Sequence, residues 1–220
     1  MRVTYEDVKR SEEIRTYITQ ADASLIALGY TEHSFAHVTR CAEVAGDLLA
    51  ELGYDEHQIE LCKIAAYMHD IGNVVNRHDH NVSGATMAFR ILDNMGMEPE
   101  DVAAVITAIG HHDDATAFPV NAIAAALILA DKTDVRRSRV RNRETINFDI
   151  HDRVNYAVER SEVSLDRDSK TFTLSLSINT EVCAVMDYFE IFLQRMLLCR
   201  KAAGFFDLTF KLDINGLTLL

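Results

Sequence analysis

Histidines and aspartates recur in this sequence at positions from which several side chains could act together. The chain has 220 residues and holds nine histidines, against two prolines and no tryptophan. The candidate residues are His33, His37, His69, Asp70, His80, His111, His112 and Asp131. Imidazole nitrogen and carboxylate oxygen together suit iron, manganese, zinc or nickel, whereas a site of oxygens alone suits magnesium. These residue types predict a transition-metal site if the fold brings them together.

Helical spacing favours such a gathering for the first four residues. His33 and His37 are four positions apart, so a helix through both would present them on one face. His69 and Asp70 close a predicted helix that is apolar on its inner side. Polar tips of this kind converge naturally at one end of a helical bundle.

Asp131 occupies an unusual position. It follows Ile128 by three residues in a predicted helix that begins at Asn121 and is apolar on nearly every side. A helix of that kind is buried, and an ionised carboxylate on its buried side must face a cation or a metal.

The alternative for any one histidine is a buried, hydrogen-bonded core group without a ligand. We prefer that interpretation, or simple exposure, for His57, His78 and His151. It is weaker for the candidate residues, because each lies at an inward position near a helix end.

Periodicity predicts a mainly α fold followed by a small α+β unit. Helices are expected over Ile14–Leu28, Thr31–Gly53, Asp55–Gly72, Val82–Met95, Pro99–Ile109 and Asn121–Asp131, with His80 in a loop. Strands are expected over Ser161–Leu165, Thr171–Ile178, Phe205–Ile214 and Leu217–Leu220, with a helix over Thr180–Ala203. We therefore predict a helical metal-binding domain at residues 1–147 and an α+β unit at 148–220.

The composition argues against a protein that binds nucleic acid, spans a membrane or is secreted. The formal net charge of −12 predicts repulsion from polymeric nucleic acid and anionic membranes. The first twenty residues are too charged for a signal peptide, and no apolar stretch reaches membrane-spanning length. We expect a cytoplasmic protein in which the four scattered cysteines are reduced core thiols.

The same residues resemble the HD superfamily of metal-dependent phosphohydrolases, whose pattern is H…HD…D. His37 matches the first position, His69-Asp70 the central pair within Met68–Gly72, and Asp131 the last. His80 and the pair His111-His112 resemble the extra histidines of branches that hold two metals. The resemblance covers about Ser24 to Arg143.

The resemblance implies an HD-type helical bundle with two metal positions. His37, His69, Asp70 and Asp131 would hold the first ion, and Asp70 would bridge to a second held by His80, His111 and His112. The sequence departs from the family's pattern where a lysine often found two or three residues after the HD pair is replaced by Asn73. The Gly-Tyr-Pro signature of the branch that degrades cyclic di-GMP is missing as well, which leaves other phosphate substrates open.

A metal-activated water is the expected nucleophile, with Asp70 as the catalytic carboxylate and His33 as a proton donor to the leaving oxygen. Arginines follow Asp131 closely, and planar guanidinium groups grip phosphate well. The candidates for binding a small phosphorylated substrate are Arg136, Arg139, Lys132 and Arg77. The alternative for these cations is a solvated face paired with nearby acidic residues.

Three functions fit these residues: hydrolysis of a phosphomonoester or phosphodiester such as a nucleotide, di-iron oxygenase chemistry, and a non-catalytic metal-binding or sensing module. The basic cluster favours the first.

The apolar face of the 180–203 helix, which includes Phe192 and Met196, fits either a homodimer interface or a cover for the unit's own sheet.

Overall fold

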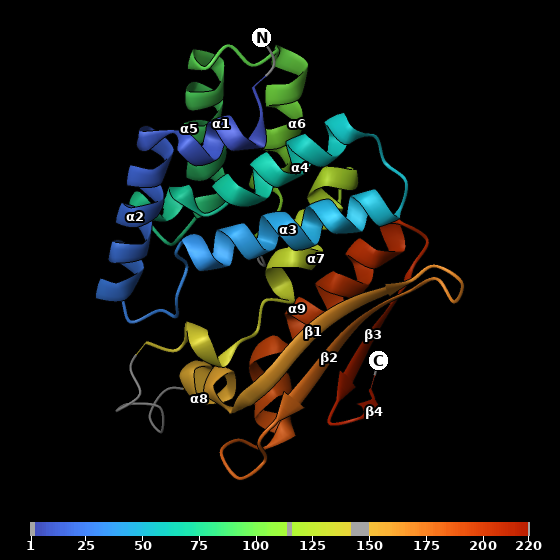
Figure 1. The fold of residues 1–220 in the computed structure, drawn as a ribbon. Coiled ribbons are helices and arrows are strands. Elements are labelled where there is room, and N and C mark those ends of the chain that lie inside the picture. The colour runs from blue at the N-terminus through green and yellow to red at the C-terminus, as the bar shows by residue number, and fades with distance from the viewer. Residues whose placement is uncertain (1–2, 114–115, 142–149, 220) are drawn as a thin grey trace. The chain divides into compact units, whose positions relative to one another are not determined.

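The computed structural model describes residues 3–113, 116–141 and 150–219. Its contacts divide the chain into two compact units, Met1–Asp131 and Lys132–Leu220. The boundary predicted at residue 147 lies in the stretch 142–149, outside the described residues. The expected fold class, mainly α with a small α+β unit at the C-terminus, is confirmed (Figure 1).

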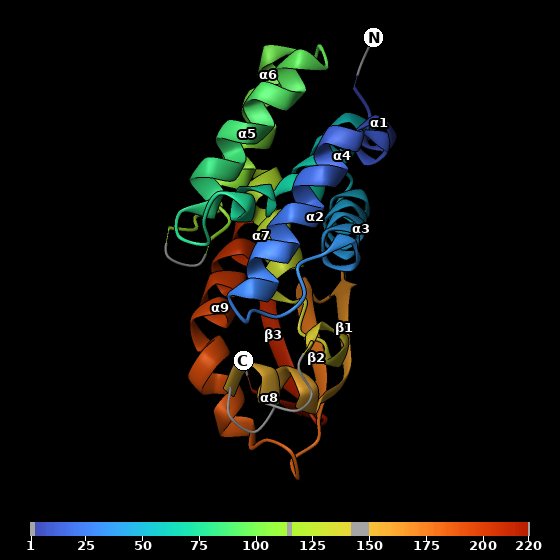
Figure 2. The same ribbon diagram turned by 90° about the vertical axis from the view of Figure 1, so that its left-hand side faces the viewer.

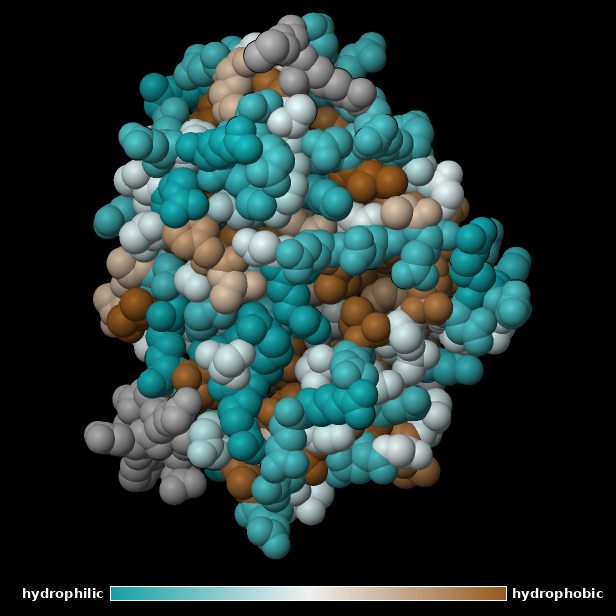
Figure 3. Space-filling model, viewed as in Figure 1, coloured by the Kyte–Doolittle hydropathy of each residue, from teal (hydrophilic) through white to brown (hydrophobic). Residues whose placement is uncertain are grey.

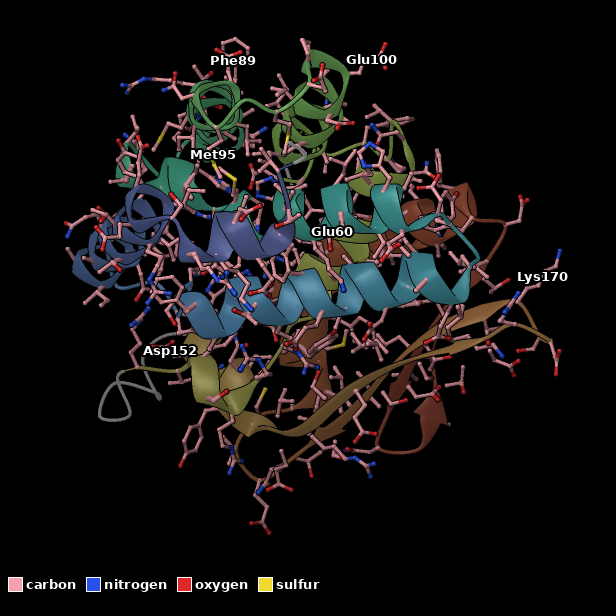
Figure 4. All side chains as sticks on the ribbon, turned by 45° about the horizontal axis from the view of Figure 1, so that its top comes forward. Glu60, Phe89, Met95, Glu100, Asp152 and Lys170 are labelled. Carbon is pink, nitrogen blue, oxygen red and sulfur yellow. The ribbon has the colours of Figure 1, made fainter. Side chains whose placement is uncertain are left out.

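The first unit is a packed set of helices (Figures 1 and 2). Its elements are α1 (Tyr5–Arg10), α2 (Glu12–Ala27), α3 (Phe35–Glu51), α4 (Glu56–Met68), the 3₁₀ turn η1 (Ile71–Val74), α5 (His80–Asn94), α6 (Pro99–Gly110) and α7 (Ala122–Lys132). Helices α3 and α4 pack against each other, as do α5 and α6. The first helix attaches to α4, where the Tyr5 N–H donates to Glu60 Oε2 at 2.8 Å (Figure 4).

Side-chain caps begin most of these helices. Asp55 Oδ1 accepts the Gln58 N–H at 2.9 Å, as the sequence predicts for α4. Asn121 Oδ1 accepts the Ala124 N–H at 2.8 Å at the start of α7. The helix predicted to begin at Thr31 begins at Phe35 instead, and Ser34 caps it by accepting the Ala36 N–H.

The fully apolar helix predicted near Asn121 is confirmed to lie in the interior. Residues 124–129 of α7 are all 0% exposed. The chain places α7 there because a helix without a polar face has no stable place at the surface.

Two glycines allow the turn after the HD pair to lie close against α5. A Cβ on Gly72 would lie 2.0 Å from the carbonyl oxygen of His80, and one on Gly84 would lie 3.2 Å from that of His69. The helix predicted to stop at Gly72 in fact ends at Met68, and η1 follows. His80, predicted in a loop, is the first residue of α5.

The second unit is a four-stranded sheet with helices. Its elements are η2 (Arg137–Arg139), α8 (Ile150–Ala157), β1 (Val158–Asp166), β2 (Thr171–Ile178), α9 (Val185–Phe205), β3 (Thr209–Ile214) and β4 (Leu217–Thr218). The strand order is β1-β2-β3-β4. Strands β2 and β3 are parallel, and α9 is the crossover between them (Figure 2). The other two pairs are antiparallel hairpins.

Local sequence accounts for the ends of these strands. Asn215 and Gly216, which separate the last two predicted strands, both take positive φ, 53° and 81°, as a tight two-residue turn requires. The long helix begins at Val185, five residues after the predicted Thr180, and β3 begins at Thr209 because α9 continues through Phe205. Phe192 and Met196 of α9 are buried, and the helix packs on β3.

Across the described residues, no helix combines the length and apolar character needed to cross a bilayer. The face seen in Figure 3 is covered mainly by hydrophilic residues, with smaller apolar areas between them.

Candidate metal centre

Four side chains from three helices converge in the first unit. His37 lies in the first turn of α3, His69 caps the end of α4, Asp70 follows it, and Asp131 lies near the end of α7. His37 Nε2 is 3.3 Å from His69 Nε2, 3.6 Å from Asp70 Oδ2 and 3.4 Å from Asp131 Oδ1. We call this group of four side chains the first position. These are the separations expected of donor atoms around one ion, since metal–ligand bonds are about 2.0–2.2 Å long.

A second group adjoins the first through Asp70. His80 at the start of α5 and His112 just after α6 face each other, with their Nε2 atoms 3.1 Å apart. Asp70 Oδ1 is 3.4 Å from His80 Nε2. Asp70, His80 and His112, called the second position here, offer donor atoms that all lie within 4.8 Å of one another.

Asp70 therefore presents one oxygen to each position. Its Oδ2 faces His37 and His69, and its Oδ1 faces His80. The residue is only 5% exposed, and Oδ2 has no hydrogen-bond partner among the described residues. A buried carboxylate oxygen without a partner is costly, and a cation at the first position would remove that cost.

Backbone carbonyls fix the orientation of the histidine rings. The Nδ1–H groups of His69, His80 and His112 donate to the carbonyls of the third residue before each, at 2.7, 3.0 and 2.6 Å. The Nε2 atom of each ring is thereby aimed into the cluster, which is the usual arrangement around a metal-binding histidine. Two Nε2 atoms that face each other at 3.1–3.3 Å need a proton or a metal ion between them. The donor set thus fits divalent transition metal ions.

Burial and the charges of neighbouring residues together shift the pKa values of the cluster. Burial disfavours a charged His69, but the carboxylates of Asp70 and Asp131 outweigh it and raise the pKa of that imidazole. Burial lowers the pKa of His80, and the charge of Arg77 adds to this effect against the attraction of Asp70. Burial acts to raise the pKa of Asp70, but the charges of His69, His33 and His80 hold it well below its usual range. The carboxylate at the centre of the cluster stays ionised.

Asn73 and Arg77 surround the outer side of Asp70. The Asn73 amide donates to Asp70 Oδ1 at 2.8 Å, so this residue, which stands where the resemblance leads us to expect a lysine, orients the Asp70 carboxylate. One Arg77 terminal nitrogen lies 3.4 Å from His80 Nε2 and 4.0 Å from Asp70 Oδ1. The guanidinium also lies over the Tyr30 ring, at 5.6 Å.

Two predicted site histidines lie differently from the expectation. His33 precedes the cap of α3 rather than lying within the helix, with its ring 5.4 Å from that of His37. His111 belongs to none of the possible metal-binding groups found among the described residues. Its ring turns back to the Thr107 carbonyl, because consecutive residues at a helix end point in different directions.

Two of the predicted cations of the second unit, Arg136 and Arg139, pair with a buried aspartate. The Arg136 guanidinium donates from two nitrogens to Asp134, and Arg139 donates to the Asp134 carbonyl at 2.8 Å. Lys132, the last residue of α7, is only 6% exposed. Both arginines form ion pairs with Asp134, and Arg139 is buried, so these contacts differ from the solvated face that was the alternative interpretation.

Two residues near the cluster had not been singled out from the sequence as ligands. Asp113 Oδ1 lies 3.9 Å from His80 Nε2, beside the second position. Cys41, expected to be a plain core thiol, lies one helical turn after His37 and joins a possible metal-binding group with His37 and Asp131. Its four-residue spacing from His37 was the available signal.

Known proteins resemble this chain in sequence. A family model described as the HD domain matches residues 34–190. The chain is 25% identical over 203 residues to an uncharacterized protein of Methanocaldococcus jannaschii, which covers 82% of this chain and 78% of that protein.

The chain is also 32% identical over 124 residues to ribonuclease Y of Cutibacterium acnes, across 53% of this chain. It spans only 22% of that enzyme's length. A solved structure described as a predicted HD superfamily hydrolase, from an uncultured Thermotogales bacterium, is 26% identical with a TM-score of 0.47. The match covers 60% of this chain and 73% of that one.

Proposed function

The chain belongs to the HD domain family, and on that premise we propose that it is a metal-dependent hydrolase of a small phosphate ester. The observation that carries the proposal is the buried Asp70, whose two oxygens face two separate groups of nitrogen donors. A divalent ion bound there supplies Lewis acidity, which lowers the pKa of a coordinated water from 15.7 toward about 7.

The side chains around the cluster then divide the work of binding and proton transfer. Arg77 lies at the edge of the second position with its side chain 24% exposed. Its guanidinium can therefore donate two parallel hydrogen bonds to a phosphoryl group. His33 donates its Nδ1–H to the Thr31 carbonyl at 2.7 Å and has its ring 5.4 Å from that of His37, and in its protonated form it is our candidate for the proton donor to the leaving oxygen.

Hydrolysis of RNA is the second candidate, and the likeness to ribonuclease Y favours it. The formal net charge of −12 opposes it, because a polyanion pays an electrostatic cost on approaching an acidic surface. The electrostatic cost is far smaller for a small phosphomonoester or a nucleotide, because such a molecule carries few charges. We therefore prefer this substrate class.

Metal analysis together with a panel of phosphomonoesters, phosphodiesters and a short RNA tests the proposal. Wild-type protein should contain divalent metal and hydrolyse at least one ester, whereas Asp70→Ala should lose both properties. His57→Ala is the control, since His57 contacts Asp101 away from the cluster, at 2.7 Å.

Equal losses in the two variants would contradict this site. Oxygen uptake by iron-loaded protein without ester hydrolysis would instead support the oxygenase. An Asp70→Ala protein that is destabilised but unchanged in every activity would support a structural metal site.

A further inference from the structure

Cys41 lies against the first position. It follows His37 by one turn of α3 and is 0% exposed. Its Sγ atom is 3.7 Å from His37 Nδ1 and 3.8 Å from His37 Nε2. Residues four apart on a helix share a face, so the sulfur is on the side of α3 that faces the cluster.

The sulfur is part of a group of donors that could surround one ion. Donor atoms of Cys41, His37 and Asp131 all lie within 4.8 Å of one another. Two ligand bonds of about 2.0–2.3 Å on opposite sides of an ion span nearly this distance. The buried Asp70 Oδ2, which lacks a hydrogen-bond partner, faces the same His37 nitrogen at 3.6 Å. It is an independent sign that a cation belongs at this point.

The other cysteines have no such setting. Cys62, Cys183 and Cys199 are buried as well, but none of them belongs to a possible metal-binding group among the described residues. Cys62 on α4 is 0% exposed like Cys41, which makes it a matched control.

We propose that Cys41 is a sulfur ligand of the first position, which selects thiophilic ions such as Zn²⁺ or Cd²⁺ over Mn²⁺ and Mg²⁺. The inference rests on the proposed metal binding and deepens it. The thiol proton passes to solvent as the metal–sulfur bond forms, and His37, His69, Asp70 and Asp131 supply the remaining donors. Thiolate ligands favour zinc and related soft ions, whereas carboxylate and water favour Mg²⁺ and Mn²⁺. One sulfur donor in a site of nitrogens and oxygens therefore shifts selectivity without excluding other ions.

The test compares wild-type protein with Cys41→Ser, Cys41→Ala and the control Cys62→Ser. X-ray absorption of protein loaded with one equivalent of Zn²⁺ should show a sulfur neighbour at about 2.3 Å in wild type and in Cys62→Ser. That neighbour should be missing from both Cys41 variants. The ratio of Cd²⁺ to Mn²⁺ affinity should fall by about tenfold or more in the Cys41 variants only, the scale on which lost site contacts weaken metal binding.

Each outcome bears on the proposal. An X-ray absorption spectrum of wild-type protein with only nitrogen and oxygen neighbours around Zn²⁺ overturns the proposal. This measurement uses wild-type protein alone and does not depend on whether any variant folds. An unchanged Cd²⁺ to Mn²⁺ ratio in Cys41→Ala overturns it as well. If either of these results is found in a protein that still binds metal and hydrolyses esters, the proposed role of Cys41 is wrong and the proposed function stands. If wild-type protein binds no divalent ion, the proposed function fails with it.

Discussion

Single ring orientations decide which histidines can act at the cluster. His111 and His112 are adjacent, and each donates its Nδ1–H to a backbone carbonyl, yet only His112 presents Nε2 to Asp70 and His80. Residue type and spacing alone do not distinguish the two, because the direction depends on how the backbone leaves α6.

The two histidines should therefore differ on substitution. His112→Ala removes a donor of the second position, so we expect metal content to fall and hydrolysis to be lost. His111→Ala should leave metal content near the wild-type value, since its ring contacts the Thr107 carbonyl. Metal analysis of both proteins after identical purification measures the difference, and the reverse result would move the second position toward His111.

Arg77 should act on substrate more than on metal. Replacing it with alanine removes charge-assisted hydrogen bonds worth about 1.5–3 kcal/mol, so KM for a phosphate ester should rise about tenfold to a hundredfold. Arg90→Ala, on the exposed side of α5, is the control. Steady-state kinetics at fixed metal loading makes the measurement, and an unchanged KM in Arg77→Ala would remove this residue from the substrate site.

The sequence predicted much of the site because the HD pair and its partners have characteristic spacings. The structure brings His37, His69, Asp70 and Asp131 together, as the pattern indicates. Cys41 was missed because its apolar neighbours on the helix are typical of a core thiol. Asp113 was missed because its proximity to His80 depends on the path of the chain after α6.

At the scale of elements, the sequence pattern predicted where helices lie more accurately than where they begin and end. Helix α4 follows its cap Asp55 directly and α6 begins at Pro99, close to the predicted starts. The start of α5 was missed because Asp79 adopts a left-handed conformation, φ 56°, which a non-glycine residue seldom takes. The short α1 was missed as well, since one and a half turns carry little periodicity.

The cap of α4 gives a prediction that is independent of metal. Asp55→Ala leaves the Gln58 N–H without its acceptor, so the free energy of unfolding should fall by about 1 kcal/mol. Asp55→Ser keeps an acceptor at this position and should recover most of the loss. Urea denaturation measures both, and metal content should not change, because His69 lies at the other end of the helix.

The contact between η1 and α5 should not tolerate a side chain. A methyl group at Gly72 would overlap the His80 carbonyl, so Gly72→Ala should cost about 1–3 kcal/mol and reduce metal content as well. Gly110→Ala is the control, because the nearest atom to its added Cβ is 3.9 Å away. Chemical denaturation with metal analysis compares them, and a Gly72→Ala protein as stable as Gly110→Ala would contradict this packing.

At the scale of the whole molecule, metal binding should be coupled to stability. An ion that binds only the folded chain at a hundredfold excess over its Kd adds about 2.7 kcal/mol to the free energy of unfolding. We therefore expect added Zn²⁺ or Mn²⁺ to raise the Tm of wild-type protein but not that of Asp70→Ala. Calorimetry with and without chelator measures the shift, and equal shifts in both proteins would place the bound ion elsewhere.

The arrangement of the sheet has a consequence for self-association. Strand β1 is an outer strand of the described sheet, nine residues long, and its backbone groups on one side lack a neighbouring strand there. Strand β1 carries several charged side chains, namely Glu159, Arg160, Glu162 and Asp166. Such a strand resists adding a copy of itself, because the net negative charge of these side chains would repel the same charge on a second copy. A pair of these molecules that formed through sheet extension would have to overcome that repulsion, so any homodimer is better sought on another surface.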